Sequence, residues 1–90
     1  MDMSAYLPLY FSESERRFDD AERALQQGDR QAFLRAAHTL RGMNLTMGFA
    51  ELAEQATELE EAAERAEEED LRRGLRALRA AVLRLRGEPG

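Results

Sequence analysis

The sequence predicts an all-α protein, an antiparallel up-down bundle of four helices in one domain. Leu and Ala dominate the apolar residues, Val occurs once and Ile never, and scarcity of β-branched residues favours helices over strands. Apolar side chains recur at alternating steps of three and four in four successive segments, the period of an amphipathic helix. Ninety residues are enough for one modest core, so we expect a single domain over residues 1–90.

The first two helices are expected over residues 4–27 and 30–45. Pro8 lies near the start of the first, where a missing amide costs little. Gly28 is a typical terminator, and Asp29 suits the N-cap of the second helix. The apolar stripes of the two helices are Leu7, Phe11, Ser14, Phe18, Ala21 and Leu25, and then Phe33, Ala37, Leu40 and Asn44.

A tight turn is expected at residues 46–48, where Gly48 can take a positive φ. A third helix then covers residues 49–67, and a fourth covers residues 70–86 with Asp70 as its N-cap. Gly74 weakens the fourth helix by about 1 kcal/mol relative to Ala, and close packing is the simplest explanation for it. The stripes are Phe49, Leu52, Ala56, Leu59, Ala63 and Ala66, and then Leu71, Leu75, Leu78, Val82 and Leu85.

Charge is distributed unevenly along the chain. Residues 51–70 hold ten acids and one arginine, whereas residues 71–86 hold six arginines and no acid. An antiparallel pair of the third and fourth helices would place these charges side by side, although each exposed pair contributes only about 0.2–1 kcal/mol. The net charge of -5 argues against a general nucleic-acid binder.

The inventory of side chains excludes several kinds of site. The absence of cysteine excludes disulfides and thiol chemistry, and one histidine is too few for a structural zinc site. There is no Gly-x-x-x-x-Gly-Lys-[Ser/Thr] loop to bind ATP, so we expect no cofactor or metal in this domain. No run reaches the roughly 18 apolar residues of a membrane span, and the N-terminus lacks a basic start. A cytoplasmic protein without membrane contact is expected.

His38, the only histidine, is the candidate reactive residue. It lies beside the apolar stripe of the second helix, so its ring should lean outward. Arg35 at i−3 and Arg41 at i+3 flank it, and Gly42 at i+4 adds no side chain to cover it. Two cations around an exposed imidazole favour an anion there. A neutral imidazole is a nucleophile near pH 7, and it works best when a carboxylate holds its other nitrogen.

Glu60 is a candidate for that carboxylate. It lies at the edge of the third stripe, and a helical hairpin that turns at residues 46–48 would bring it across to His38. From periodicity alone Glu60 is one of many acids, and a solvated glutamate is a strong alternative interpretation. For His38, the corresponding alternative is an ordinary histidine on an unrelated four-helix scaffold.

Three segments together resemble histidine-containing phosphotransfer (HPt) domains: residues 35–43 (Arg-Ala-Ala-His-Thr-Leu-Arg-Gly-Met), 46–49 (Thr-Met-Gly-Phe) and 59–60 (Leu-Glu). Within that family the chain is most similar to the amino-terminal domain of CheA-type chemotaxis kinases. The His-x-x-[Lys/Arg]-Gly motif alone is weak, but it is specific when joined to Thr-x-Gly-Phe and Leu-Glu at these offsets. The helical layout also agrees, so the resemblance spans nearly the whole chain.

The resemblance implies a phosphorelay role. His38 would accept a phosphoryl group from an ATP-dependent histidine kinase domain and pass it to an aspartate of a response-regulator receiver domain. Glu60 would hold the other ring nitrogen, Arg41 would face the phosphate, Gly42 would leave space, and Gly48 would belong to the turn that docks the third helix. ATP and Mg²⁺ would come from the partner domains, so the chain would be a carrier and not an enzyme on its own.

Two positions depart from the family pattern. Arg41 replaces a lysine, and its planar fork has a different reach. Thr57 stands where the chemotaxis kinases often carry a second histidine, so the proton network near the site must differ. Partners are expected to dock on Leu34, Leu45 and the start of the third helix. The alternative function is an interaction module of the same fold that binds a receiver or kinase without phosphorylation.

Overall fold

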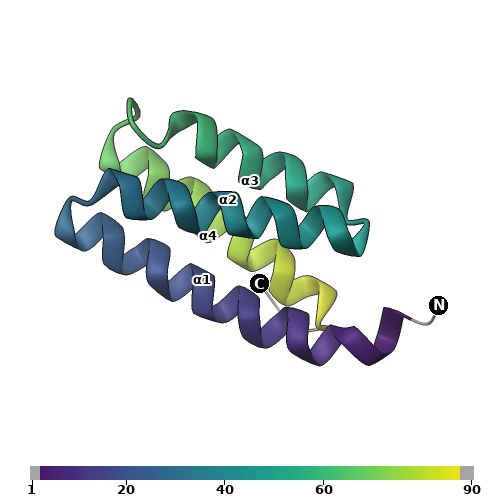
Figure 1. Cartoon of the computed structure of the whole chain (residues 1–90). Coiled ribbons are helices and arrows are strands. Elements are labelled where there is room, and N and C mark those ends of the chain that lie inside the picture. The colour runs from purple at the N-terminus through teal and green to yellow at the C-terminus, as the bar shows by residue number, and fades with distance from the viewer. Residues whose placement is uncertain (1–2, 88–90) are drawn as a thin grey trace.

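The computed structural model describes residues 3–87, and four α-helices make up most of this part of the chain. A short 3-10 helix precedes them. The elements are η1 (Met3–Tyr6), α1 (Leu7–Gln27), α2 (Arg30–Met47), α3 (Ala50–Ala62) and α4 (Glu68–Leu85). Successive helices run in opposite directions, and α2 packs against both α1 and α3 (Figure 1). The predicted all-α four-helix bundle is confirmed.

The predicted apolar stripes form the core of the bundle. The largest fully buried apolar side chains are Phe18, Leu25, Phe33, Leu40, Leu71 and Leu78. Each such side chain contributes about 1.5–3 kcal/mol when it leaves water, so the stripes account for how the helices pack. Leu85 is an exception, because its side chain at the end of α4 is 49% exposed. Each helix keeps a polar face, and none within residues 3–87 is long and apolar enough to cross a bilayer.

The first two helices differ from the predicted ranges of 4–27 and 30–45. Residues before Leu7 form the tighter η1, and α2 continues through Thr46 to Met47. The Thr46 hydroxyl donates to the Gly42 carbonyl at 3.0 Å, a bond typical of a helix interior. The predicted turn at 46–48 is therefore wrong at its first two residues. The helix ends at Gly48, whose φ of 78° closes it as the sequence predicts.

The third and fourth helices also differ from their predicted ranges of 49–67 and 70–86. α3 ends at Ala62, and α4 begins at Glu68. Glu67 has an extended backbone (φ −63°, ψ 146°) and takes the N-cap position that was predicted for Asp70. Asp70 instead lies in the first turn of α4 with two glutamates, where carboxylates suit the positive end of the helix dipole.

The predicted charge pairing between the third and fourth helices is wrong. No ion pair joins α3 to α4 within residues 3–87; the arginines of α4 bond to α1 and to the start of α4 itself. Arg79 lies 2.7 Å from Glu15, and Arg72 lies 3.6 Å from Glu22 and 3.0 Å from Glu68. Burial of the α4 stripe fixes the rotation of this helix, and Arg72 and Arg79 then fall beside α1.

Candidate functional site

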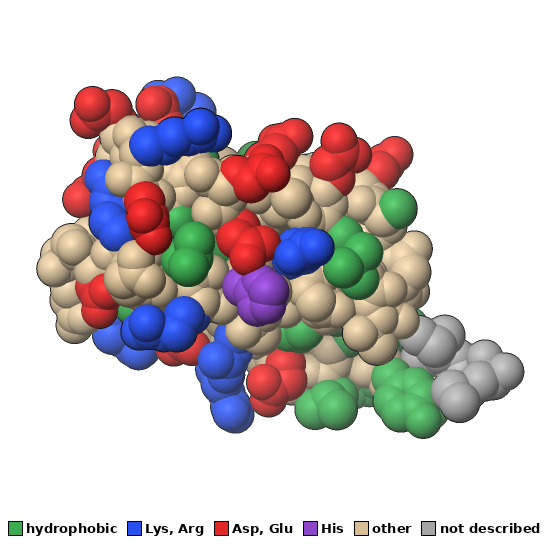
Figure 2. Space-filling model, turned by 45° about the horizontal axis from the view of Figure 1, so that its top comes forward, with side chains coloured by type: hydrophobic (Ala, Val, Ile, Leu, Met, Phe, Trp, Pro, Cys, Tyr) green, Lys and Arg blue, Asp and Glu red, His purple; other side chains and the backbone are tan. Residues whose placement is uncertain are grey.

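His38 projects from the middle of α2, away from the core. Its side chain is 64% exposed, whereas its neighbours Ala37 and Leu40 are buried. The ring therefore leans outward as the sequence predicts, because the apolar stripe fixes which side of α2 faces inward. Figure 2 shows the histidine in the middle of an open face, with acidic and basic side chains close to it.

Glu60 reaches His38 from α3. Its Oε2 lies 2.6 Å from Nδ1 of the imidazole. The two residues stand at similar distances along the chain from the turn at Gly48, so the antiparallel hairpin of α2 and α3 brings them to the same level. An ionised carboxylate only accepts hydrogen bonds, so Nδ1 of a neutral ring carries the proton and the lone pair lies on Nε2.

Arg41 shares the same carboxylate. Its Nη1 lies 3.5 Å from Oε1 of Glu60, so the two oxygens of Glu60 face different partners. The side chains of Arg41 and Glu60 are 41% and 21% exposed, so solvent partly screens this pair. No cluster of three or more histidine or acidic side chains that could hold a metal ion occurs among the described residues.

Arg35 and Thr57 lie apart from the contact between His38 and Glu60. Arg35 is exposed and lines a polar groove with Arg17 and other residues of α1. The Thr57 hydroxyl donates to the Ala53 carbonyl at 2.8 Å, within α3 itself. Between residues 3 and 87, neither side chain makes a hydrogen bond to the imidazole or to its carboxylate.

Gly42 lies on an open part of the surface, one turn from His38. A Cβ atom built on Gly42 would meet no atom within 4 Å. The packing of this chain therefore does not require glycine at this position. If glycine is required at this position, the requirement must come from a molecule that approaches His38 and needs the space beside it.

Sequence reasoning missed a buried polar contact behind the site. The Tyr10 hydroxyl donates to Asn44 Oδ1 at 2.6 Å, and Asn44 Nδ2 donates to the Leu40 carbonyl at 2.8 Å. Both side chains are buried, and burial raises the pKa of Tyr10. The contact joins α1 to the core side of α2, the helix that carries His38. An amide within an apolar stripe was the signal that could have revealed it, because a buried amide needs partners.

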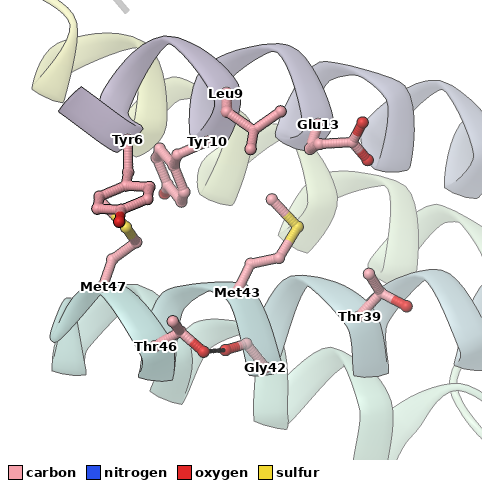
Figure 3. A pocket seen from close by; sticks show the side chains of 9 residues that line it. All are labelled: Tyr6, Leu9, Tyr10, Glu13, Thr39, Gly42, Met43, Thr46 and Met47. Atoms are coloured by element: carbon pink, nitrogen blue, oxygen red, sulfur yellow. Dashed lines mark hydrogen bonds between the residues drawn. The ribbon is translucent and has the colours of Figure 1, made fainter.

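A groove of about 670 Å³ opens between α1 and α2 beside the site. Leu9 and Tyr10 of α1 face Met43 and Met47 of α2 across it (Figure 3). Thr39, the residue that follows His38, lies on the same wall. This hollow is mostly apolar, and its lining includes Thr39 and Gly42, which lie one and four positions after His38.

The groove lies on a different side of α2 from the docking patch predicted from the sequence. That patch contained Leu45, which is 57% exposed, and Leu34, which is partly buried against the core. Neither residue lines the groove. The α3 side of the face carries exposed acids instead, namely Glu51, Glu54, Glu58 and Glu61.

Comparison with known protein families assigns a class to this bundle. The family model of the Hpt domain matches residues 5–88, and the chain belongs to that family. Hpt domains carry phosphoryl groups, so the chain has a phosphotransfer role in two-component signalling. Searches of curated proteins and of solved structures found no match.

Proposed function

We propose that His38 is the phosphoacceptor of this Hpt domain. The observation that carries the proposal is the 2.6 Å contact of Glu60 Oε2 with Nδ1 of a ring that is otherwise exposed. The contact keeps the proton on Nδ1 and leaves the Nε2 lone pair available as a nucleophile. His38 is also the only histidine in the chain, so no other imidazole can serve.

The transfer has two steps. Nε2 of His38 attacks the γ-phosphorus of ATP on a kinase domain; the N–P bond forms and the bond to the ADP oxygen breaks. Glu60 stabilises the positive charge that the ring gains. A carboxylate oxygen of a receiver aspartate then attacks the same phosphorus, and the N–P electron pair returns to Nε2. The partner domains hold ATP and Mg²⁺, so this chain is a carrier and not a catalyst.

Arg41 and Gly42 serve the phosphorylated state. The Arg41 guanidinium, now beside Glu60, turns to the phosphoryl oxygens, where charge-assisted hydrogen bonds are strong. Gly42 keeps the approach to Nε2 open, and Arg35 adds positive potential. Thr57 takes no direct part, because its hydroxyl is bonded to the Ala53 carbonyl.

Partner domains approach over the groove between α1 and α2. Both partners bring an anionic centre, either ATP phosphates or receiver carboxylates. The exposed acids of α3 repel such a centre, whereas Arg35 lies exposed toward α1, where Arg17 balances Glu13 and Asp20. The apolar groove then supplies contact area beside His38.

The donor is a CheA-type kinase domain and the pathway is chemotaxis, working in the cytoplasm. The sequence around His38 and the turn at Gly48 support this assignment, because they are most similar to that subgroup. A kinase of this class is therefore the reagent of choice for the test.

The test incubates the chain with a CheA-type catalytic domain and radiolabelled ATP. Wild type is expected to gain phosphate that is acid-labile and base-stable, as a phosphohistidine is, and His38→Gln is expected to gain none. Equal labelling of His38→Gln would refute the proposal. Binding of the kinase without any label would favour the interaction module instead.

A further inference from the structure

The end of α3 is unlike the ends of the other helices. Each of the other three α-helices in residues 3–87 is followed within two residues by a glycine with positive φ, namely Gly28, Gly48 and Gly87. Such a glycine lets backbone amides bond to the carbonyls of the last turn. α3 ends at Ala62 with Ala63 as its C-cap, no positive-φ glycine follows within two residues, and the Ala63 amide makes a long bond of 3.4 Å to the Glu60 carbonyl.

Glu60 lies in this last turn of α3. Terminal turns fray, because the last four carbonyls of a helix lack partners within it. Here the Ala62 carbonyl accepts from the Arg65 and Ala66 amides just beyond the helix. The side chain that contacts His38 therefore stands on a terminal turn whose hold depends on what the chain after Ala62 is bonded to.

Arg30 of α2 supplies bonds at this end. Its Nη1 donates to the carbonyls of Ala63 at 3.1 Å and of Ala66 at 2.6 Å, and these bonds are partly buried. Beside it, Gln31 Nε2 donates to Glu64 Oε1 at 2.7 Å. The start of α2 thus holds the chain where α3 stops.

Helix dipoles favour the same arrangement. Arg30 is the first residue of α2, where a cation meets the positive end of its own helix and is unfavourable. At the C-terminus of α3 the same cation is favourable. Arg30 and the turn at Gly48 therefore secure the α2–α3 hairpin on either side of His38 and Glu60.

We infer that Arg30 is a positioning residue that caps α3 from α2 and thereby holds Glu60 against Nδ1 of His38. It touches neither the imidazole nor a phosphoryl group and acts through the last turn of α3. The inference rests on the proposed function of Glu60, but its main readouts need no phosphorylation.

The experiment compares Arg30→Met, which keeps the apolar stem but removes the donors, with Arg30→Lys and with Arg76→Met on the exposed side of α4. In Arg30→Met, amide hydrogen exchange at residues 60–63 should rise on the order of tenfold, as when a charged hydrogen bond is lost. Amides in the middle of α3 should change little. Imidazole ¹⁵N spectra should show a smaller fraction of the Nδ1–H tautomer of His38. Arg30→Lys should recover part of both effects, and Arg76→Met should match wild type.

Two results would overturn the inference. One is an Arg30→Met protein whose exchange at residues 60–63 and whose His38 tautomer match wild type. The other is faster exchange spread evenly over all helices with an unchanged tautomer, which would make Arg30 a general stabiliser only. Labelling with phosphoramidate, a small phosphoryl donor, tests the acceptor role separately. A wild-type chain that stays unlabelled at His38 would refute the acceptor role. The hydrogen-exchange and tautomer results for Arg30→Met would still decide whether Arg30 holds Glu60 in place.

Discussion

At the scale of single residues, Glu60 divides its carboxylate between the His38 ring and the Arg41 guanidinium. The short bond to Nδ1 sets which ring nitrogen carries a lone pair, whereas the longer and more exposed contact to Arg41 contributes little energy. We therefore propose that the site requires the charge of Glu60 and not only its shape.

Glu60→Gln tests this requirement. The amide keeps the size of the side chain but loses the charge that stabilises a cationic ring. The initial rate of His38 phosphorylation should fall by about 10²-fold, the lower range for a positioned acid or base. Glu61→Gln, an exposed neighbour of equal chemistry, is the control and should label like wild type. Equal rates for Glu60→Gln and Glu61→Gln would contradict the orienting role.

The sequence identifies these site residues unequally. His38 can be identified from the sequence alone, because it is the only histidine. Glu60 is one of ten acids in residues 51–70, and only the resemblance to a family selected it. The bond between Tyr10 and Asn44 spans 34 positions, so the amide in the apolar stripe indicates a buried partner but no local pattern identifies Tyr10 as that partner.

At the scale of helices, Gly42 and Gly74 are a natural pair for comparison. Both lie inside helices, but a Cβ on Gly42 meets open space, whereas one on Gly74 would come 2.7 Å from Leu59 Cδ2. The close packing expected of Gly74 is therefore observed, and it lets α4 approach α3 beside Glu60.

The two Gly→Ala substitutions should have opposite effects on the free energy of unfolding. Gly42→Ala should raise it by about 1 kcal/mol through helix propensity. Gly74→Ala makes the same gain, but displacing Leu59 costs about 1–3 kcal/mol, so a net loss is expected. Urea denaturation of both variants measures the difference. A Gly74→Ala protein as stable as Gly42→Ala would show that Leu59 moves aside without cost.

The contact of Tyr10 with Asn44 predicts a dependence on alkaline pH. Burial raises the pKa of Tyr10 above its usual value of 10.0, so the folded protein keeps a proton that the unfolded chain loses. The stabilisation is complete below pH 10 and is lost as the pH rises through the folded-state pKa. Stability should therefore fall above pH 10.

Tyr10→Phe should cost about 1–3 kcal/mol at pH 7, because Asn44 Oδ1 then has no donor. In the same variant, the free energy of unfolding should fall less steeply above pH 10 than in wild type. Urea denaturation at several pH values measures both effects, with Tyr6→Phe, which alters a half-exposed ring, as the control. A Tyr10→Phe protein with the wild-type pH profile would contradict the account of this contact.

Helix ends were harder to predict than helix faces, and α3 shows why. Nothing between Glu61 and Glu67 breaks a helix, so propensity carried the prediction to residue 67. The end at Ala62 coincides with bonds from Arg30, a residue more than 30 positions earlier. The apolar stripes were easier to predict than the helix ends, because the spacing of apolar residues shows directly which face of a helix is buried.

At the scale of the whole molecule, the face around His38 is electrostatically asymmetric. Exposed acids follow α3 on one side, whereas the α1 side carries an apolar groove and, beyond it, arginines of which Arg17 is paired with Glu13 and Asp20. The charge runs in the sequence predicted ion pairs between α3 and α4 that the structure does not contain within residues 3–87. The reason is that burial of the apolar stripe sets the rotation of each helix about its axis. The same rotation leaves the acids of α3 exposed beside the site.

Leu9→Asp and Leu45→Asp compare the groove with the patch predicted from the sequence. Their side chains are similarly exposed, at 61% and 57%, and only Leu9 lines the groove. A charge at Leu9 should slow transfer from the kinase domain on the order of tenfold, the loss of about 1.4 kcal/mol of contact. Leu45→Asp should have little effect, and phosphoramidate labelling should be unchanged in both. The reverse order would place docking on the α2–α3 side.

The central claim is that Glu60 holds Nδ1 and leaves Nε2 of His38 to take the phosphoryl group. Phosphoramidate labelling of ¹⁵N-histidine protein, followed by ³¹P–¹⁵N correlation, reads the bonded nitrogen directly. The account predicts a single phosphorus–nitrogen coupling, to Nε2, with the proton on Nδ1. Phosphorus bonded to Nδ1, or no phosphorus on the ring, would contradict it.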